Sequence, residues 1–296
     1  MITILRTVLL SISLFFLCHP SYAANNLNVQ GIYLTQSTLE NTTYLNYLIR
    51  QAKASGIDTF VIDLERPSKR SRANIALVKE HGIKYVARIT MFPGGGTPAM
   101  IKNPDIWQRK YALVNQALNW GADAIQLDYI RYNTKQRASQ ENAKDILKII
   151  AWYKSKLGKI PLQVDVFGET SFGESKYIGQ NARLFSEKVD YLCPMVYPSH
   201  YSPFAEHYKT PYATVHGSLQ RIQQQFPDNA PVKVIAYIEL SNYHYPMSGT
   251  KRVDYIKAQI KAVNDAGVEG FYAWSAHNRY DYLFRVLQEH NKTAEK

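Results

Sequence analysis

Short β-like runs alternate with longer helical patterns along almost the whole chain, and this alternation is the feature that most constrains the fold. The expected strands are residues 31–35, 58–64, 84–90, 123–129, 161–167, 189–196, 232–238 and 268–274. Helical patterns cover about 44–54, 104–120, 141–156 and 280–289, and two further helices end at Gly82 and near Gly267. Strands that alternate with helices are typical of parallel βαβ units.

Glycines mark the ends of several expected helices, where a left-handed cap residue is favoured. They are Gly56, Gly82, Gly121, Gly158 and Gly267. Eight strand–helix units in one chain of this length predict a single-domain (β/α)8 TIM barrel, which we place at residues 24–296. The alternative is a doubly wound open sheet, but residues 34–37 lack the glycine-rich turn that usually follows its first strand. Gly94–Gly96 also lacks phosphate-loop spacing, so we interpret it as a flexible loop.

The first 23 residues have the features of an export signal. Arg6 precedes an apolar run at residues 8–17, and Ser21 and Ala23 are the small residues that precede a cleavage site. We therefore expect a Sec-type signal peptide that is cleaved after Ala23, and a secreted or periplasmic protein. The apolar run is short for a membrane span, and no later stretch is long enough, so we expect no stable membrane insertion. Cleavage would leave Cys193 without a cysteine partner for an intrachain disulfide.

The chain has a net charge of +11, which favours acidic partners such as nucleic acid, anionic lipid or uronic-acid polymers. The Lys and Arg residues are scattered, however, and the densest run is residues 69–72. Because export argues against a nucleic-acid partner, we expect a carbohydrate partner and no nucleic acid. No cofactor is implied, and the sequence does not indicate an oligomeric state.

Carboxylates follow four of the eight expected strands, at the barrel face where TIM-barrel active sites lie. They are Asp63 and Glu65, then Asp128, then Asp165 and Glu169, and finally Glu239. Glycoside hydrolysis requires one protonated carboxyl to protonate the leaving oxygen and one carboxylate to attack the sugar or activate water. The pattern therefore favours a glycoside hydrolase.

Several assignments of the catalytic roles are compatible with the sequence. We expect Asp128 to be the nucleophile or transition-state stabiliser, with Arg131 orienting it. Asp165 or Glu169 would be the acid/base, and Glu239 is a competing nucleophile. Each of these residues could instead be structural or solvated. Asp63 and Glu65 are expected to form structural ion pairs with Arg66 or Arg88.

Aromatic and basic residues accompany these carboxylates and could bind sugar. The candidate substrate-binding residues are Arg131, Tyr197, His200, Tyr201, Tyr237 and Trp274. Each also has a structural interpretation, as a loop, core or surface residue. No HxH or HExxH pair predicts a metal site, and no GxSxG elbow predicts a serine nucleophile. Cys193 is expected to be a packed apolar residue.

Three segments resemble motifs of a bacterial glycosyl-hydrolase TIM-barrel family that was long carried as a domain of unknown function. They are Gly121–Tyr132 (GADAIQLDYIRY), Val164–Gly168 (VDVFG), and Asp190-Tyr191 with Pro194–Tyr201 (PMVYPSHY). The resemblance extends from about Gly31 to Tyr280. It implies a barrel related to the α-amylase-like and galactosaminidase-like clans, with Asp128 as the key carboxylate. It names no substrate. Ile62–Glu65 departs from the family pattern, in which a basic residue follows the Asp, so a role for Asp63 is not implied.

The resulting hypothesis is a hydrolase of a polysaccharide or cell-envelope glycan that needs no metal. Two alternatives belong to other classes. A catalytically silent, glycan-binding barrel would hold Asp128 and Asp165 in ion pairs with no open cleft between them. A metal-assisted hydrolase on the same fold would need a bound metal with His and carboxylate ligands.

Overall fold

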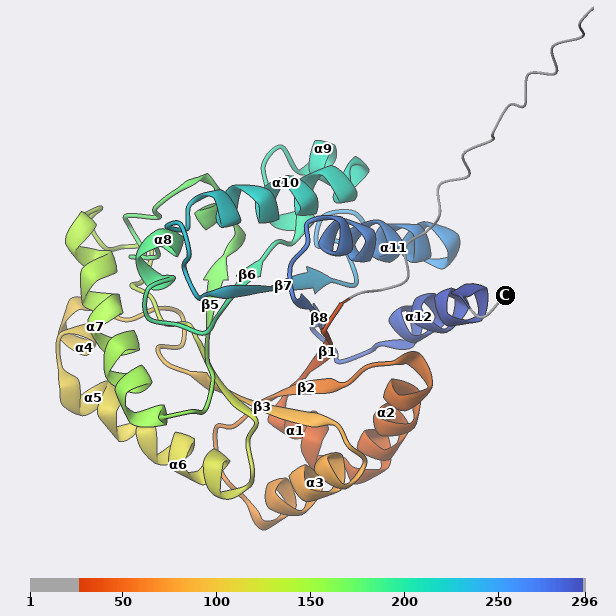
Figure 1. The fold of residues 1–296 in the computed structure, drawn as a ribbon, viewed down its shortest axis with the longest axis horizontal. Coiled ribbons are helices and arrows are strands. Elements are labelled where there is room, and N and C mark those ends of the chain that lie inside the picture. The colour runs from red at the N-terminus through yellow and green to blue at the C-terminus, as the bar shows by residue number, and fades with distance from the viewer. Residues whose placement is uncertain (1–26, 295–296) are drawn as a thin grey trace, which may run out of the picture.

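Eight parallel strands close into one barrel in sequence order, which confirms the predicted (β/α)8 fold (Figure 1). The computed structural model describes residues 27–294, so the expected signal peptide and its cleavage site lie outside the described residues. The strands are β1 (Val29–Leu34), β2 (Thr59–Asp63), β3 (Lys84–Thr90), β4 (Ala124–Asp128), β5 (Leu162–Phe167), β6 (Tyr191–Met195), β7 (Lys233–Glu239) and β8 (Gly270–Trp274). All eight lie within a few residues of the predicted runs. The β1–β8 pairing, in which Gln30 lies opposite Phe271, closes the ring.

A ring of helices surrounds the barrel (Figure 1). The α-helices are α1 (Gln36–Glu40), α2 (Thr42–Ser55), α3 (Lys69–Glu80), α4 (Pro98–Ile101), α5 (Pro104–Arg109), α6 (Tyr111–Asn119), α7 (Gln140–Leu157), α8 (Ala182–Phe185), α9 (Phe204–Lys209), α10 (Pro211–Gln224), α11 (Gly249–Asp265) and α12 (Asp281–Ala294). Two short 3-10 helices are η1 (Gly168–Phe172) and η2 (Pro198–His200). The single helix expected at 104–120 is divided at Lys110 into α5 and α6. The five cap glycines have φ values between +56° and +80°, as helix-terminating glycines often do.

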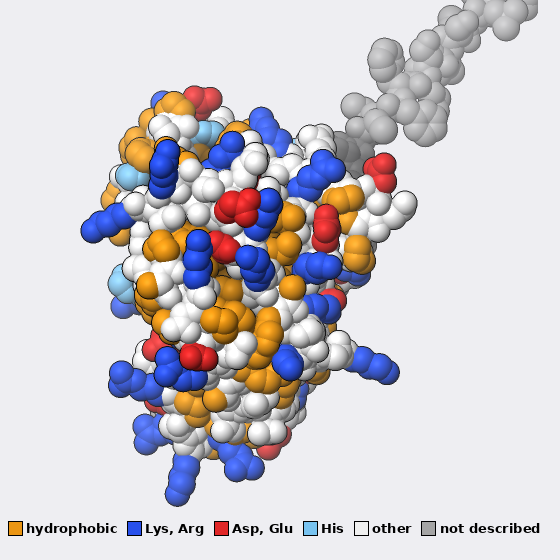
Figure 2. All heavy atoms as spheres, turned by 90° about the vertical axis from the view of Figure 1, so that its left-hand side faces the viewer, with side chains coloured by type: hydrophobic (Ala, Val, Ile, Leu, Met, Phe, Trp, Pro, Cys, Tyr) orange, Lys and Arg blue, Asp and Glu red, His pale blue; other side chains and the backbone are white. Residues whose placement is uncertain are grey.

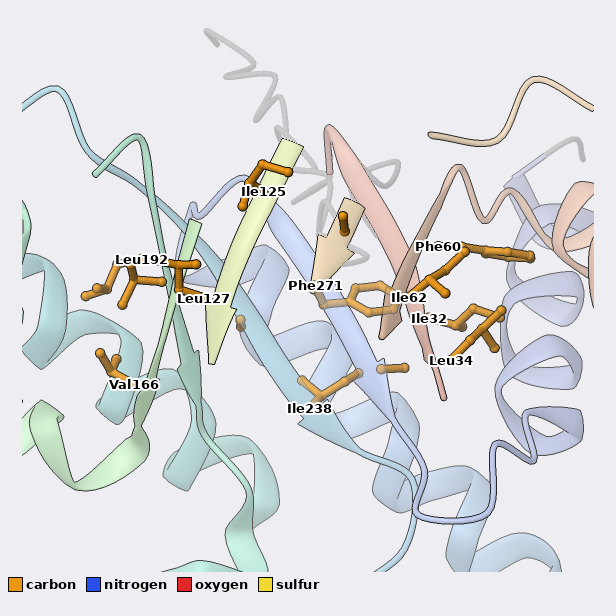
Figure 3. Close-up of a cluster of buried hydrophobic side chains, with 14 of the residues drawn as sticks. Ile32, Leu34, Phe60, Ile62, Ile125, Leu127, Val166, Leu192, Ile238 and Phe271 are labelled. Atoms are coloured by element: carbon orange, nitrogen blue, oxygen red, sulfur yellow. The ribbon is translucent and has the colours of Figure 1, made fainter. Parts of the chain in front are cut away.

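The main core lies between the strands and the helices. Alternate strand residues such as Ile32, Phe60, Leu127 and Val166 point away from the barrel axis and are fully buried (Figure 3). Burial of one large aliphatic or aromatic side chain stabilises a fold by about 1.5–3 kcal/mol. This layer therefore fixes which residues of each strand face outward, and the residues between them must face the barrel interior.

The barrel interior contains a second cluster and a chain of polar side chains. Val61, Val86 and Ile235 belong to this cluster, and so does Cys193, which is fully buried as expected. A hydrogen-bonded chain crosses the interior. The Tyr237 hydroxyl donates to Gln126 Oε1 at 2.8 Å, Gln126 Nε2 donates to Gln163 Oε1 at 3.0 Å, and Gln163 Nε2 donates to the Tyr272 hydroxyl at 3.1 Å. These polar groups satisfy one another and give the barrel a packed interior in place of a pore.

On the face that Figure 2 shows, the basic side chains are scattered over the surface. Lys and Arg side chains there alternate with acidic and apolar groups, and they do not gather into one patch. Within residues 27–294, the helices are all too short or too polar to cross a membrane.

Candidate active site

A pocket of about 160 Å³ lies at the carboxyl ends of the strands. Side chains from β1, β3, β4, β5, β6, β7 and β8 and from the loops that follow them converge on it. The lining residues are Tyr33, Arg88, Asp128, Tyr129, Arg131, Asp165, Phe167, Gln180, Met195, Tyr197, His200, Tyr237 and Trp274. This is the barrel face at which TIM-barrel enzymes carry out their chemistry.

Arg88 joins three carboxylates at the base of the pocket. Its two terminal nitrogens form ion pairs with Asp63 and Asp128, and its Nε lies 3.6 Å from Asp165 Oδ2. Asp63 also accepts a hydrogen bond from the Tyr33 hydroxyl. Burial opposes the charge of the Arg88 guanidinium, but the surrounding carboxylates, Asp128 first, hold its pKa well above the usual range. Asp63 is thus a structural ion partner of Arg88, as expected.

Asp128 and Asp165 are neighbours on adjacent strands. Leu127 pairs with Val164, so the next residue of each strand is one of the two acids. Adjacent strands are about 4.8 Å apart, and both side chains reach the pocket. Asp165 is only 1% exposed, and neither of its carboxyl oxygens has a hydrogen-bond partner. Burial, reinforced by the charge of Asp128, raises the pKa of Asp165 well above its usual value.

The two carboxyls therefore have different surroundings. Asp128 forms an ion pair with Arg88, whereas Asp165 is desolvated beside another acid, which favours its protonated form. Divergent environments for two neighbouring carboxyls are the arrangement that separates an acid from a nucleophile or base.

The segment after Asp128 has a backbone conformation that side chains rarely adopt. Tyr129 has φ = +51°, and its amide donates a hydrogen bond back to Asp128 Oδ1. Non-glycine residues in the left-handed region cluster at functional sites, because the surrounding structure must hold them there. The turn places Tyr129 and then Arg131 on the wall of the pocket. It is Arg88, and not Arg131 as expected, that forms the ion pair with Asp128.

Aromatic side chains form the wall opposite the β4 residues. The Tyr197 ring stacks on the Trp274 ring with their centroids 5.4 Å apart, and it meets the His200 ring at 5.2 Å. Tyr237, below them, is held by its hydrogen bond to Gln126. The pKa of His200 is below the usual value, because desolvation and the nearby His244 disfavour its charge. A neutral imidazole and stacked rings suit contact with sugar hydroxyls and sugar faces.

This aromatic wall continues out of the pocket over the loop that follows β7. The His200 ring contacts the Tyr243 ring at 6.5 Å, Tyr243 contacts His244 at 6.1 Å, and His244 stacks on Phe204 at 3.9 Å. Tyr243 is 78% exposed and Phe204 is 41% exposed. We call His200, Tyr243, His244 and Phe204 the aromatic track. Large exposed rings that run outward from a pocket indicate a surface for a partner.

Three expected site residues lie outside the lining of the pocket. Glu169 is exposed on η1, where it accepts a hydrogen bond from Ser175 Oγ at 2.6 Å. Glu239 is 1% exposed and accepts from the Ser199 amide at 2.9 Å and from the Tyr255 hydroxyl at 2.6 Å. Tyr201 is buried and packs its hydroxyl against Gly168, where a Cβ would lie 2.1 Å away. Glu65, the other acid after β2, is exposed.

Glu239 therefore secures the loop that carries the aromatic wall. Its hydrogen bonds fix Ser199, which lies between Tyr197 and His200 in the chain. Burial raises the pKa of Glu239 to about 7, and the hydrogen bonds from Ser199 and Tyr255 limit that rise.

Other pocket residues were absent from the sequence-based candidates for the active site. Tyr33, Phe167, Gln180 and Met195 all reach the pocket, and so does Arg88, which was expected only as an ion partner of Asp63 or Glu65. Strict alternation along β1 and β3 could have identified Tyr33 and Arg88, because each falls on the inward-facing side of a strand near its carboxyl end. Gln180 lies well beyond the end of β5 in the chain, and its Oε1 accepts a hydrogen bond from the Phe167 amide. No sequence pattern predicts this contact.

The described part of the chain has no group of three or more His, Cys, Asp or Glu residues arranged to hold a metal ion. The three acids at the base of the pocket are organised by a guanidinium instead.

Residues 99–280 match a family model described as "putative glycosyl hydrolase domain". No curated protein matches the chain. Among solved structures, the endo-1,4-β-mannanase of Rhizomucor miehei shares 13% identity at a TM-score of 0.66, over 91% of this chain and 96% of that one. A chitinase of Chromobacterium violaceum shares 12% identity at a TM-score of 0.59, over 89% and 99%. The spore cortex-lytic enzyme of Bacillus megaterium shares 11% identity at a TM-score of 0.63, over 90% and 75%. At these identities the likeness concerns the fold.

Proposed function

The chain belongs to this glycosyl hydrolase domain family, and from that premise we propose that it hydrolyses O-glycosidic bonds of a polysaccharide or cell-envelope glycan. The observation that carries the proposal is the pair of adjacent carboxyls, Asp128 beside a cation and Asp165 without a hydrogen-bond partner, on the wall of one pocket.

The two carboxyls have distinct roles in the proposed reaction. Asp165 donates its proton to the glycosidic oxygen, so that the leaving sugar departs as a neutral alcohol. Asp128 either attacks the anomeric carbon or stabilises the positive charge that develops there. Water then supplies the hydroxyl of the second product, and the proton that it releases restores Asp165. Arg88 acts as a positioning residue, because it holds the Asp128 carboxylate in place.

The aromatic track supports a chain of sugars as the substrate rather than a monosaccharide. The pocket itself is small, with a volume of about 160 Å³. The Tyr243 and Phe204 rings lie beyond it and remain exposed. Sugars bonded to the one in the pocket would stack on these rings.

An envelope location is part of the proposal. It rests on the export signal that we infer for residues 1–23, whose small residues at 21 and 23 precede the expected cleavage site. A secreted or periplasmic enzyme would meet polysaccharides and cell-wall glycans before any intracellular sugar.

The test is a screen of purified protein against a panel of bacterial, plant and fungal glycans, with reducing ends measured over time. Asp128→Asn is compared with wild type, and Asp228→Asn is the matched control, because Asp228 is an exposed acid that lies outside the pocket. We expect turnover by wild type and by the control variant only. Equal turnover by Asp128→Asn, with circular dichroism unchanged, would remove Asp128 from the mechanism.

A second candidate is a barrel that binds glycans without cleaving them. The observation that favours it is the double ion pair of Arg88 with Asp63 and Asp128, which occupies the proposed nucleophile. It predicts retention of a glycan by the immobilised protein with no new reducing ends. The glycan panel therefore separates the two candidates when binding and cleavage are measured on the same samples.

A further inference from the structure

Arg131 is a buried cation on the pocket wall that forms no ion pair within the described residues. Its guanidinium carbon lies 4.9 Å from the Phe167 ring centroid and 5.5 Å from the Tyr129 ring centroid. The residue is 8% exposed. One terminal nitrogen donates to the Tyr132 carbonyl at 2.9 Å, while Nε is buried without a hydrogen-bond partner.

Arg131 contrasts with Arg88 across the same pocket. Arg88 has three carboxylates within 4.0 Å, whereas no Asp or Glu of the described residues comes that close to Arg131. Asp128 is occupied by Arg88, and Glu169 is exposed beside Ser175. Burial of a charge without an ion-pair partner is unfavourable. Desolvation lowers the pKa of Arg131, and the charges of Asp128 and Glu169 oppose this fall only in part.

The surroundings keep the guanidinium in place despite this cost. The two rings lie within cation–π distance of the guanidinium and stabilise its charge. Gly95 allows the approach of the loop, because a Cβ there would lie 2.6 Å from the bound terminal nitrogen of Arg131. The protein thus holds a guanidinium on the wall of the pocket, and one of its buried donors has no hydrogen-bond partner.

We propose that Arg131 binds a carboxylate carried by the sugar in the pocket, so that the substrate is an acidic glycan. The inference rests on the proposed function and names its substrate class. A planar guanidinium fork matches a carboxylate in geometry and charge. Two kinds of sugar present this group, a uronic acid with a C6 carboxylate and a muramic acid with a lactyl ether. The net charge of +11 would also attract an acidic polymer to the protein.

The experiment measures binding, so it does not depend on turnover. Two pairs of sugars are titrated into the purified protein and followed by NMR, glucuronate against glucose and N-acetylmuramate against N-acetylglucosamine. We expect one acidic sugar to bind about 10- to 100-fold more tightly than its neutral partner, as hydrogen bonds to a charged group would give. The pair that shows this preference identifies which kind of carboxylate is recognised. The preference should weaken when salt is raised.

Variants then assign the preference to Arg131. Arg131→Gln should abolish the preference for the acidic sugar, whereas Arg50→Gln, which removes an exposed charge on α2, should preserve it. Arg131→Lys keeps the positive charge but lacks the planar guanidinium, so it should retain a reduced preference for the acidic sugar. This variant tests the inference if Arg131→Gln is too unstable to measure.

Two results would overturn the inference. One is equal affinity of wild type for the acidic and neutral member of both pairs. The other is a preference that survives in folded Arg131→Gln. Failure of the hydrolase proposal would give a different result. The acidic sugar would then bind through Arg131, while no glycan in the panel is cleaved.

Discussion

Asp165 lies 3.6 Å from the Nε of Arg88, yet neither of its carboxyl oxygens has a hydrogen-bond partner. At this distance Arg88 and Asp165 form an ion pair, but the separation is too long for a hydrogen bond. The terminal nitrogens of the same guanidinium are already paired with Asp63 and Asp128. Arg88 therefore pairs directly with Asp128 and reaches Asp165 only at longer range, so the two neighbouring acids have different surroundings.

Replacement of Asp165 by Asn should lower kcat by about 10²–10⁴, the range typical of a lost general acid. The pKa of Asp165 is raised, so wild-type activity should fall as pH rises through that value and the acid loses its proton. Asp165→Asn should lack this alkaline limb. The pH–rate profile of both proteins on the same glycan is the measurement.

Leaving-group dependence separates chemistry from folding in this variant. An aryl glycoside whose phenolate departs without protonation should be cleaved by Asp165→Asn nearly as fast as by wild type in the bond-breaking step. An equal loss on glycan and aryl glycoside would contradict the role of Asp165 as an acid.

Replacement of Arg88 by Gln should destabilise the protein by about 3–5 kcal/mol, because it leaves buried carboxylates without their cation. Urea unfolding at neutral pH measures this change. Adding Asp63→Asn should recover part of the loss, since one fewer buried charge is then uncompensated. Lys79→Gln is the comparison, because the Lys79–Asp123 pair is partly exposed and should contribute at most about 1 kcal/mol. Similar losses in the two single variants would contradict the buried network.

Glu239 should make stability depend on pH. Its pKa is about 7 in the folded protein, above the ordinary 4.5. A raised acid pKa means that the folded state holds the proton more tightly, so this stabilisation is complete below about pH 4.5 and is lost as pH rises to about 7. The change corresponds to about 3 kcal/mol. Glu239→Gln should remove it, so the difference in unfolding free energy between the two proteins should vary across this window. A difference that is constant with pH would contradict the assignment.

Loss of the Tyr243 ring should affect long substrates more than short ones. Tyr243 is outside the pocket lining but belongs to the aromatic track. Tyr243→Ala should therefore raise the KM for a polymer by roughly 2- to 12-fold, which corresponds to about 0.5–1.5 kcal/mol per stacked ring. The kcat on the shortest cleaved substrate should be unchanged. Tyr177→Ala is the control, because Tyr177 is 60% exposed and is neither a pocket-lining nor a track residue. Equal effects on long and short substrates would exclude the track as a binding surface.

Local patterns were sufficient to predict the barrel. Short runs of β-branched and aromatic residues mark strands such as Thr59–Asp63, and glycines such as Gly121 end the helices that separate them. These signals act over a few residues, and the parallel order of the strands follows from the connections between them. The carboxyl ends of parallel strands meet at one face, which is why Asp128 and Asp165 could be placed together in advance.

The selection among the other candidates depended on contacts between residues that are distant in sequence. Glu169 and Glu239 follow strands as Asp165 does, but one turns to solvent and the other is hydrogen-bonded to Ser199 and Tyr255. Arg88 comes from β3 and pairs with acids of β2 and β4, so its role depends on the register of three strands. The sequence by itself determined where the strands and helices lie and that the acids at the strand ends share one face, because these follow from residues close together in the chain. Only the tertiary structure decided which acid has a cation beside it and which cation lacks an acid beside it. Charge pairing depends on distances between strands and loops, and no local pattern encodes those distances.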